Sequence, residues 1–309
     1  MRREEIKLEV AFANALTLKG DVLDGKEHHD RALAIYDAAE HRPLTTRSGR
    51  DIRVALLASR SGCAWLLGYP AAARSDADQA LKEAREIKHA TTLLHALWRA
   101  GYHHILCGDY AAADARVDEL LGLADERGAP YWKALGTAER GWLFASTGKA
   151  SDAVRAITLG ITSLRSMEQA ALYEPNHLQY LAMAYADLGQ FHDAWRCIDD
   201  AMDKIEKSTE KWVEAEVHRI AGEIALKSPA PDTEKAENYF EHALSVARAQ
   251  QAKSWELRAA MSLARLWRDQ GKPQQARELL APVYGWFTEG FDTVDLKEAK
   301  RLLEELAAT

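Results

Sequence analysis

The sequence is short of the features that mark several large protein classes. Its 309 residues contain three cysteines and no Cys-x-x-Cys pair, which argues against a disulfide framework or a zinc knuckle. A net charge of −7 lacks the basic excess of a nucleic-acid binder. No apolar run reaches the roughly 18 residues of a membrane span, and the N-terminus lacks the apolar core of a signal peptide. We therefore expect a cytoplasmic protein that binds neither nucleic acid nor membrane.

Motifs for catalysis and nucleotide binding are also missing. The chain has no Gly-x-x-x-x-Gly-Lys-[Ser/Thr] phosphate loop. His28-His29 and His103-His104 are the tempting metal pairs, but adjacent helical residues point about 100° apart and do not converge on one ion. Cys107 has His103 one turn away, yet it directly precedes a turn glycine and is interpreted as a packing thiol. We predict no catalytic residue, no metal and no cofactor.

The sequence does contain a column of turn residues with a period close to 40. The column consists of Gly20, Gly68, Gly108, Gly148, Gly189, Pro229 and Gly271. The intervals between them are 48, 40, 40, 41, 40 and 42 residues. Long helical patterns flank each turn, and strand-like alternation is absent. A fixed period of this kind predicts an array of helix–turn–helix repeats, which usually serves binding.

Columns of small residues on both sides of the turn define the type of repeat. Seven residues before it stand Ala13, Ser61, Gly101, Gly141, Ala182, Gly222 and Ala264. Five residues after it stand Gly25, Ala73, Ala113, Ala153, Ala194 and Ala276, with Ala236 displaced by two in the sixth repeat. Four residues further on, most positions are apolar: Val117, Ile157, Ile198, Phe240 and Leu280. Small residues at these positions let paired helices approach closely.

This spacing resembles the tetratricopeptide repeat (TPR) in a long variety. HEAT-type repeats share the period but lack the small–turn–small spacing. The predicted fold class is all-α: a right-handed TPR superhelix, an α-solenoid of seven repeats and a C-terminal capping helix. We expect a single solenoid over 1–309, with repeats at about 4–41, 50–88, 90–127, 130–167, 174–207, 212–250 and 254–287 and the cap at 293–307. Residues 41–49 are predicted to be a loop, and the cap is expected to bury Leu296, Ala299, Leu303 and Leu306.

Several stretches resemble one kind of TPR region more specifically. They are 34–44, 65–70, 212–223 and above all Leu257-Arg-Ala-Ala-Met-Ser-Leu-Ala-Arg-Leu-Trp-Arg-Asp-Gln-Gly271 with 280–293. Together they are similar to the C-terminal TPR region of bacterial signalling ATPases of the adenylate cyclase and transcriptional-activator type, including the sensor arm of the maltose-regulon activator at fold level. The resemblance implies a regulatory arm, and the missing phosphate loop means that the family's enzymatic activities do not carry over.

In TPR superhelices the first helix of each pair lines the concave surface, which gives a set of candidate ligand-binding residues. The set is aromatic in its N-terminal half and rich in arginine in its C-terminal half: Trp65, Trp98, Tyr102, Trp142, Met183, Arg219, Glu223, Arg258, Arg265 and Arg268. Aromatic and arginine side chains supply most binding hot spots, and arginine suits carboxylates or phosphates. The alternative left open is that the tryptophans fill gaps between helices and the arginines pair with Glu216, Glu223 and Glu256.

These observations predict a non-enzymatic binding or sensing module. Its expected partner is a protein or peptide segment, another domain of a parent chain, or a small effector with an acidic group. A free-standing TPR scaffold or adaptor is the alternative within binding, and a small-molecule enzyme built in the groove is the alternative from another class. A closed pocket with converging titratable groups would favour the enzyme.

Overall fold

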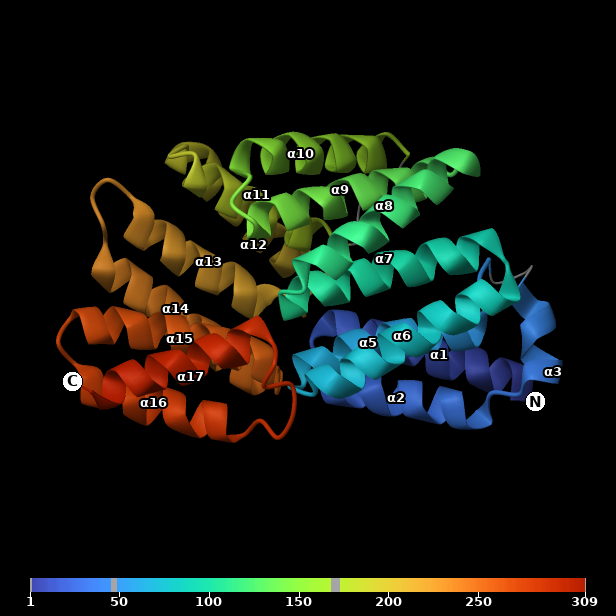
Figure 1. Cartoon of the computed structure of the whole chain (residues 1–309), viewed down its shortest axis with the longest axis horizontal. Coiled ribbons are helices and arrows are strands. Elements are labelled where there is room, and N and C mark those ends of the chain that lie inside the picture. The colour runs from blue at the N-terminus through green and yellow to red at the C-terminus, as the bar shows by residue number, and fades with distance from the viewer. Residues whose placement is uncertain (1, 46–48, 168–172, 309) are drawn as a thin grey trace.

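The structure is a computed structural model that describes residues 2–45, 49–167 and 173–308. Helices follow one another in pairs along the chain (Figure 1). The pairs are α1 (Arg2–Lys19) with α2 (Val22–Ile35), α5 (Ile52–Leu66) with α6 (Pro70–Ile87), α7 (Ala90–Cys107) with α8 (Tyr110–Glu126), α9 (Pro130–Ser146) with α10 (Ala150–Ser166), α11 (Glu174–Asp187) with α12 (Phe191–Lys207), α13 (Glu214–Lys227) with α14 (Thr233–Ala249), and α15 (Lys253–Asp269) with α16 (Pro273–Gly285). A single helix, α17 (Val294–Ala307), ends the series.

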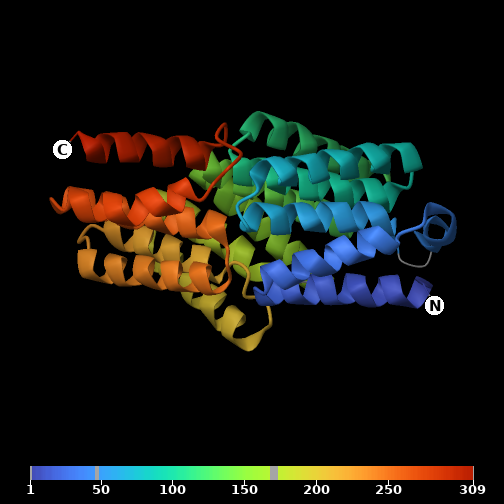
Figure 2. The ribbon, with the colours of Figure 1, turned by 90° about the horizontal axis from the view of Figure 1, so that it is seen from below.

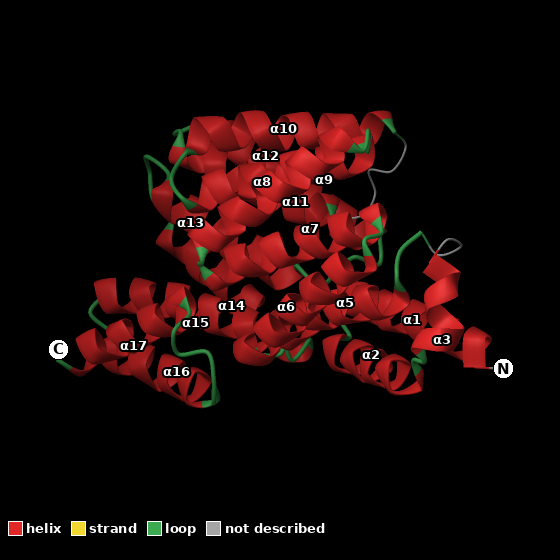
Figure 3. Cartoon of the chain, turned by 45° about the vertical axis from the view of Figure 1, so that its right-hand side comes forward, coloured by secondary structure: helices red, strands yellow, loops and turns green. Residues whose placement is uncertain are grey.

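The regular elements of the described residues are all helical, as Figure 3 shows. The predicted all-α solenoid of TPR type is confirmed. None of the described helices is long and apolar enough to cross a membrane.

The glycines of the turn column adopt the left-handed backbone conformation that ends a helix. Six of the seven turns carry a glycine with φ between 72° and 95°, a region that side chains disfavour. The residue after each glycine donates its N–H to a carbonyl five residues earlier, as Asp109 does to His104 O at 2.9 Å. The sixth turn has Pro229 instead, and there Asp232 caps α14 by accepting the N–H of Lys235 at 2.9 Å.

The small columns lie where two helices of a pair touch. A Cβ atom added to Gly222 would overlap the ring of Phe240, and one added to Gly141 would lie 2.8 Å from the backbone nitrogen of Ile157. The apolar positions that follow are buried: Val117, Ile157, Ile198, Phe240 and Leu280 are each at most 1% exposed. The sequence pattern therefore encodes the close packing inside each repeat.

Two local expectations need correction. The predicted loop at 41–49 begins with helical turns, α3 (Ala38–His41) and η1 (Arg42–Leu44), because Asp37 caps α3 and Pro43 fits a first helical turn; residues 46–48 lie outside the described part. In α17, Leu302 is 2% exposed while Leu303 is only partly buried. The spacing of Leu296, Ala299, Leu302 and Leu306 follows the helical period more closely than the predicted stripe.

The array curls until its sixth and seventh repeats lie beside its first three (Figures 1 and 2). The rings of Trp65 and Trp255 meet edge to face, with centroids 4.8 Å apart. Ser254 Oγ donates to the backbone oxygen of Trp65, and an Arg258 guanidinium nitrogen donates to Leu106 O at 2.9 Å. These contacts join residues 152 to 190 positions apart in the chain. The concave surface is consequently enclosed on several sides.

Turn residues of the early repeats form much of this closure. A Cβ atom on Gly68 would lie 2.6 Å from the ring of Trp286. The backbone N–H groups of Ala71 and Ala72, at the start of α6, both donate to Glu289 Oε1 at 3.0 Å. In the first repeat, Leu18 O accepts the N–H groups of residues 211 and 212 at 2.7 and 3.2 Å.

Two glycine substitutions test whether the small columns are required for packing. We expect Gly222→Ala to lower the free energy of unfolding by about 1–3 kcal/mol, because the new methyl group overlaps Phe240. The matched control is Gly122→Ala on α8, where a Cβ atom meets nothing within 4 Å. That variant should raise the stability by up to about 1 kcal/mol through helix propensity. Denaturant unfolding of both variants makes the comparison, and equal effects would contradict the packing argument.

Candidate functional site

The closed array encloses a cavity of about 200 Å³ between its first three repeats, which we call the N-terminal cavity. The first helices α1, α5 and α7 supply most of its wall, and residues preceding α11 and α13 complete it. The lining residues are Asn14, Thr17, Leu18, His29, Arg50, Ser59, Gly62, Leu66, His95, Arg99, Tyr102, Leu106, Tyr173 and Trp212.

Arg99 brings a positive charge to this cavity. Its Nε donates to Ala58 O at 3.2 Å, and its guanidinium lies 5.5 Å from the ring centroid of the neighbouring Trp98. Within the described ranges, Arg99 has no carboxylate within ion-pair distance. A partly buried guanidinium without a counter-charge favours an anionic group in the adjacent space.

Aromatic side chains form the wall around this charge. The Tyr102 ring packs edge to face with Trp142 at 5.1 Å and with Trp212 at 6.3 Å. Its hydroxyl donates to Asn176 Oδ1 at 3.1 Å. Trp98 contacts Tyr173 with ring centroids 5.0 Å apart. The cavity thus combines a rigid apolar wall with a cationic group.

Glu210 holds two residues of the cavity wall in place. Its carboxylate accepts the backbone N–H of Tyr173 at 2.9 Å and the indole N–H of Trp212 at 3.2 Å. Burial raises the pKa of Glu210 to about 7, although both hydrogen bonds favour the charged form. Tyr173 and Trp212 are therefore positioned by a carboxyl group that titrates near neutral pH.

Burial disfavours the charged forms of the histidines and of the tyrosine hydroxyl at this cavity. Burial lowers the pKa of His95 well below its usual value and that of His29 to about 4, and the charge of Arg99 adds to both effects. Burial also raises the pKa of Tyr102 well above its usual value. Near Arg99, Glu139 is completely buried, and burial raises its pKa as well. Burial thus disfavours a negative charge on Tyr102 and Glu139, the nearby groups that could otherwise compensate Arg99.

The Cys107–His103 pair does come together, with Sγ and Nε2 3.5 Å apart. Burial raises the pKa of the Cys107 thiol to about 12 and lowers that of His103 to about 3. Both groups therefore remain neutral, and the nucleophilic thiolate is disfavoured.

A second space of about 250 Å³, the C-terminal cavity, lies between the middle and last repeats. It is lined by Ile105, Tyr110, Ala145, Ser146, Gln179, Tyr180, Met183, Glu216, Arg219, Arg258, Met261, Ser262, Arg265, Val294, Asp295 and Glu298. Its arginines, in contrast to Arg99, are engaged by acidic residues of the chain itself.

An internal charge network crosses this second cavity. Glu216 accepts two hydrogen bonds from Arg219 at 2.8 Å and one from Arg258 at 3.3 Å. Arg258 also donates to Asp295 Oδ2 at 2.8 Å. Burial disfavours the charged form of Glu216, but the two guanidinium groups outweigh it and lower its pKa. The network balances its charges, which is what buried ions require.

The predicted binding residues separate into groups. Tyr102 lines the N-terminal cavity, while Met183, Arg219, Arg258 and Arg265 line the C-terminal cavity. The remaining five residues line neither: Trp65, Trp98 and Trp142 are each at most 4% exposed in the helix packing, Glu223 accepts hydrogen bonds from Arg219 and Ser262, and Arg268 pairs with Glu305.

Two features of these sites were missed in the sequence. The spacing from the turn that predicts the concave surface selected Trp98. Arg99 is the next residue in the chain, so this spacing did not select it. The acidic partners of Arg258 and Arg265 include Asp295 and Glu298 of α17, whereas the sequence pointed to Glu216, Glu223 and Glu256. Glu256 instead pairs with Arg248 and Lys253. Contacts between repeats and the capping helix are not visible in the repeat pattern.

The fold has known relatives in structure, although no family model and no curated protein matches the chain. A Rap protein complexed with Competence and Sporulation Factor superposes with a TM-score of 0.66 at 11% identity, covering 98% of this chain and 80% of that one. The Rap conjugation gene regulator of the plasmid pLS20, in complex with the Phr* peptide, gives 0.64 at 10% identity, covering 98% and 74%. Aspartyl phosphate phosphatase F from Bacillus subtilis gives 0.58 at 13% identity, covering 94% and 71%. At such low identity, the likeness shows a shared helical-repeat fold.

Removal of the Glu210 charge should change the pH dependence of stability. The folded pKa of about 7 lies above the unfolded value near 4.5, so the folded state holds the proton more tightly. The contribution of Glu210 to the free energy of unfolding is fully present below pH 4.5. It is lost as the pH rises to 7, and the loss is about 3 kcal/mol at most. We expect the unfolding free energy of Glu210→Gln, relative to wild type, to rise by up to this amount over that range. A constant difference between the two proteins from pH 4.5 to 7.5 would contradict the assignment.

Proposed function

We propose that the chain is a non-enzymatic binding module that takes an acidic, partly apolar peptide segment into its N-terminal cavity. The observation that carries this proposal is Arg99, a guanidinium without a carboxylate partner among the described residues, beside an aromatic wall. A carboxylate of the ligand would supply the missing partner through charge-assisted hydrogen bonds. The apolar part of the segment would pack against Tyr102, Tyr173 and Trp212.

The size of the cavity narrows the ligand class. Sites for whole small molecules usually measure about 300–1,000 Å³. A volume of about 200 Å³ holds one or two residues of a peptide, with the rest of the segment outside. Two of the structural relatives are described in complex with a peptide or a factor, namely the Phr* peptide and Competence and Sporulation Factor. These complexes support a peptide as the ligand class for a solenoid of this shape.

The titratable groups support binding over catalysis. General acid–base work needs a group whose pKa lies near the working pH. Burial shifts the pKa values of His29 and His95 well down from the usual histidine value, and it shifts the pKa of Tyr102 well up from the usual tyrosine value. Glu210, whose pKa is about 7, is occupied by the backbone of Tyr173 and the indole of Trp212. A small-molecule enzyme in this groove remains the less supported alternative.

Two wider predictions belong to this proposal. The chain would act as a single solenoid over 1–309, with the closure between early and late repeats as support. It would also pass ligand binding to a partner or to another domain, as the resemblance to the arms of signalling ATPases implies. The binding proposal does not depend on that second prediction, and a free-standing adaptor would use the same cavity.

The test selects peptides on the purified chain from a random library with free C-terminal carboxylates, using wild type, Arg99→Gln and Arg265→Gln. Wild type should enrich acidic peptides that contain apolar or aromatic residues. Loss of a charged hydrogen-bond partner should weaken the selected peptides about 10- to 100-fold in Arg99→Gln. Arg265→Gln is the matched control, because Arg265 lines the C-terminal cavity and pairs with Glu298.

Equal affinity of wild type and Arg99→Gln would contradict the proposed anchor. A loss confined to Arg265→Gln would transfer the site to the C-terminal cavity. Both variants are first checked by circular dichroism and thermal melting, so that a folding defect is not read as a binding defect.

A further inference from the structure

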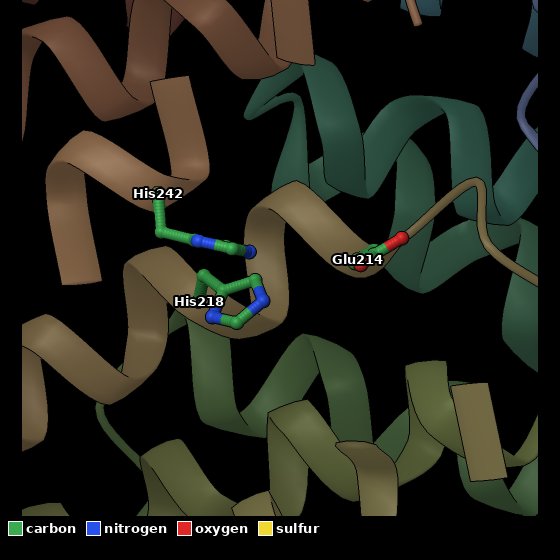
Figure 4. A group of neighbouring side chains, drawn as sticks. All are labelled: Glu214, His218 and His242. Atoms are coloured by element: carbon green, nitrogen blue, oxygen red, sulfur yellow. The ribbon is translucent and has the colours of Figure 1, made fainter. Parts of the chain in front are cut away.

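Three side chains with metal-binding atoms converge on the outer side of the sixth repeat. Glu214 and His218 are four residues apart on α13, and His242 belongs to the paired helix α14. One ligand atom from each of the three lies within 4.8 Å of the others. Figure 4 shows the two imidazole rings next to each other in a tilted arrangement, with Glu214 on the same helix as His218. The ring centroids of His218 and His242 are 4.1 Å apart.

The protein itself leaves these groups without partners. Nδ1 of His218 is buried and has no hydrogen-bond partner. Across the described residues, none of the three side chains takes part in an ion pair. The neighbouring cation, Lys235, is directed to the ring of Trp195, with Nζ 3.9 Å from the ring centroid. A metal ion would engage all three unpartnered groups at once.

The spacing of the three residues suits coordination. Residues at i and i+4 lie on one face of a helix, so Glu214 and His218 project to the same side. The helix pair α13–α14 then brings His242 opposite them. Tetrahedral ligands about 2.0–2.1 Å from an ion lie roughly 3.3 Å from one another, so side-chain rotation must contract the present cluster. His242 is exposed and Glu214 only half-buried, which leaves both side chains room for this rotation.

The donor set indicates the class of metal. Two imidazole nitrogens and one carboxylate oxygen suit zinc and the neighbouring divalent transition metals better than magnesium or calcium, which prefer all-oxygen sites. Burial and the adjacent His242 lower the pKa of His218 to about 4, so the ring is neutral at physiological pH. A surface depression of about 470 Å³, which His218 and His242 line together with Tyr239, offers space for a water or another ligand.

We propose that Glu214, His218 and His242 bind one divalent transition-metal ion, best matched by zinc, between α13 and α14. The ion would connect the two helices of the only one of the seven repeats whose turn position is a proline, Pro229. It would therefore stabilise the sixth repeat, whose first helix supplies Glu216 and Arg219 to the C-terminal cavity. The adjacent histidine pairs of the sequence gave no hint of this site, because its two histidines are 24 positions apart.

The experiment measures zinc binding to the full chain without a histidine tag, after removal of metal with a chelator. The variants are His218→Ala and His242→Ala, with His192→Ala as the matched control because His192 is an exposed histidine on α12. Isothermal titration gives the zinc stoichiometry and affinity, and Co²⁺ alone provides visible absorption bands that report the ligand set. Thermal melting with the chelator present establishes that each variant folds.

We expect one zinc ion per chain in wild type and in His192→Ala. His218→Ala and His242→Ala should each lower the affinity for zinc by more than roughly 10- to 100-fold. Loss of a residue that only hydrogen-bonds to a metal ligand costs roughly 10- to 100-fold, and loss of a ligand should cost more. Zinc should also raise the melting temperature of wild type and of His192→Ala but not of His242→Ala. Zinc binding of equal affinity in wild type and His242→Ala would overturn the proposal, as would the absence of any zinc binding to wild type.

Discussion

The closed form of the array depends on the guanidinium of Arg258. It lies over the rings of Trp65 and Trp255, 5.2 Å from each centroid, and donates hydrogen bonds to Leu106 O and Asp295. A single side chain thus connects the second, third and seventh repeats with the capping helix. Arginine suits this position because it combines a flat face for aromatic rings with five donors in a fixed plane. The closure in turn converts a concave surface into two separate cavities.

The two cavities differ in whether the arginines at their walls are paired with carboxylates. Around the C-terminal cavity, Arg258 and Arg219 face Glu216 and Asp295, and the positive and negative groups balance. Around the N-terminal cavity, burial disfavours the charged forms of His95 and Glu139, and Arg99 has no carboxylate within ion-pair distance in the described structure. Because an uncompensated charge lowers stability, its presence at a cavity wall points to function. The balanced network stabilises the closed array, whereas the unpaired charge of Arg99 is the group to which we assign ligand binding in the proposed function.

The repeat fold could be predicted from the sequence because its determinants are local. The left-handed turn glycines and the small residues that pack against Phe240 and Ile157 recur at fixed offsets. The sites could not be predicted in the same way, because they depend on contacts between distant repeats. Arg99 was missed by one position in the concave register. The partnership of Arg258 with Asp295 required knowledge of how far the array curls, which no single repeat encodes.

The turn glycines have a second role that reaches beyond the local backbone. Gly20, Gly68 and Gly108 lie against Gln250, Trp286 and Val294, so the turns of the first three repeats are covered by the sixth and seventh repeats and the capping helix. In an open solenoid each repeat contacts only its neighbours, and unfolding can spread inward from either end. Here, fraying of the last repeat would uncover the turns of the earliest ones. The two ends of the chain therefore share their stability, and the array gains the long-range cooperativity of a globular domain.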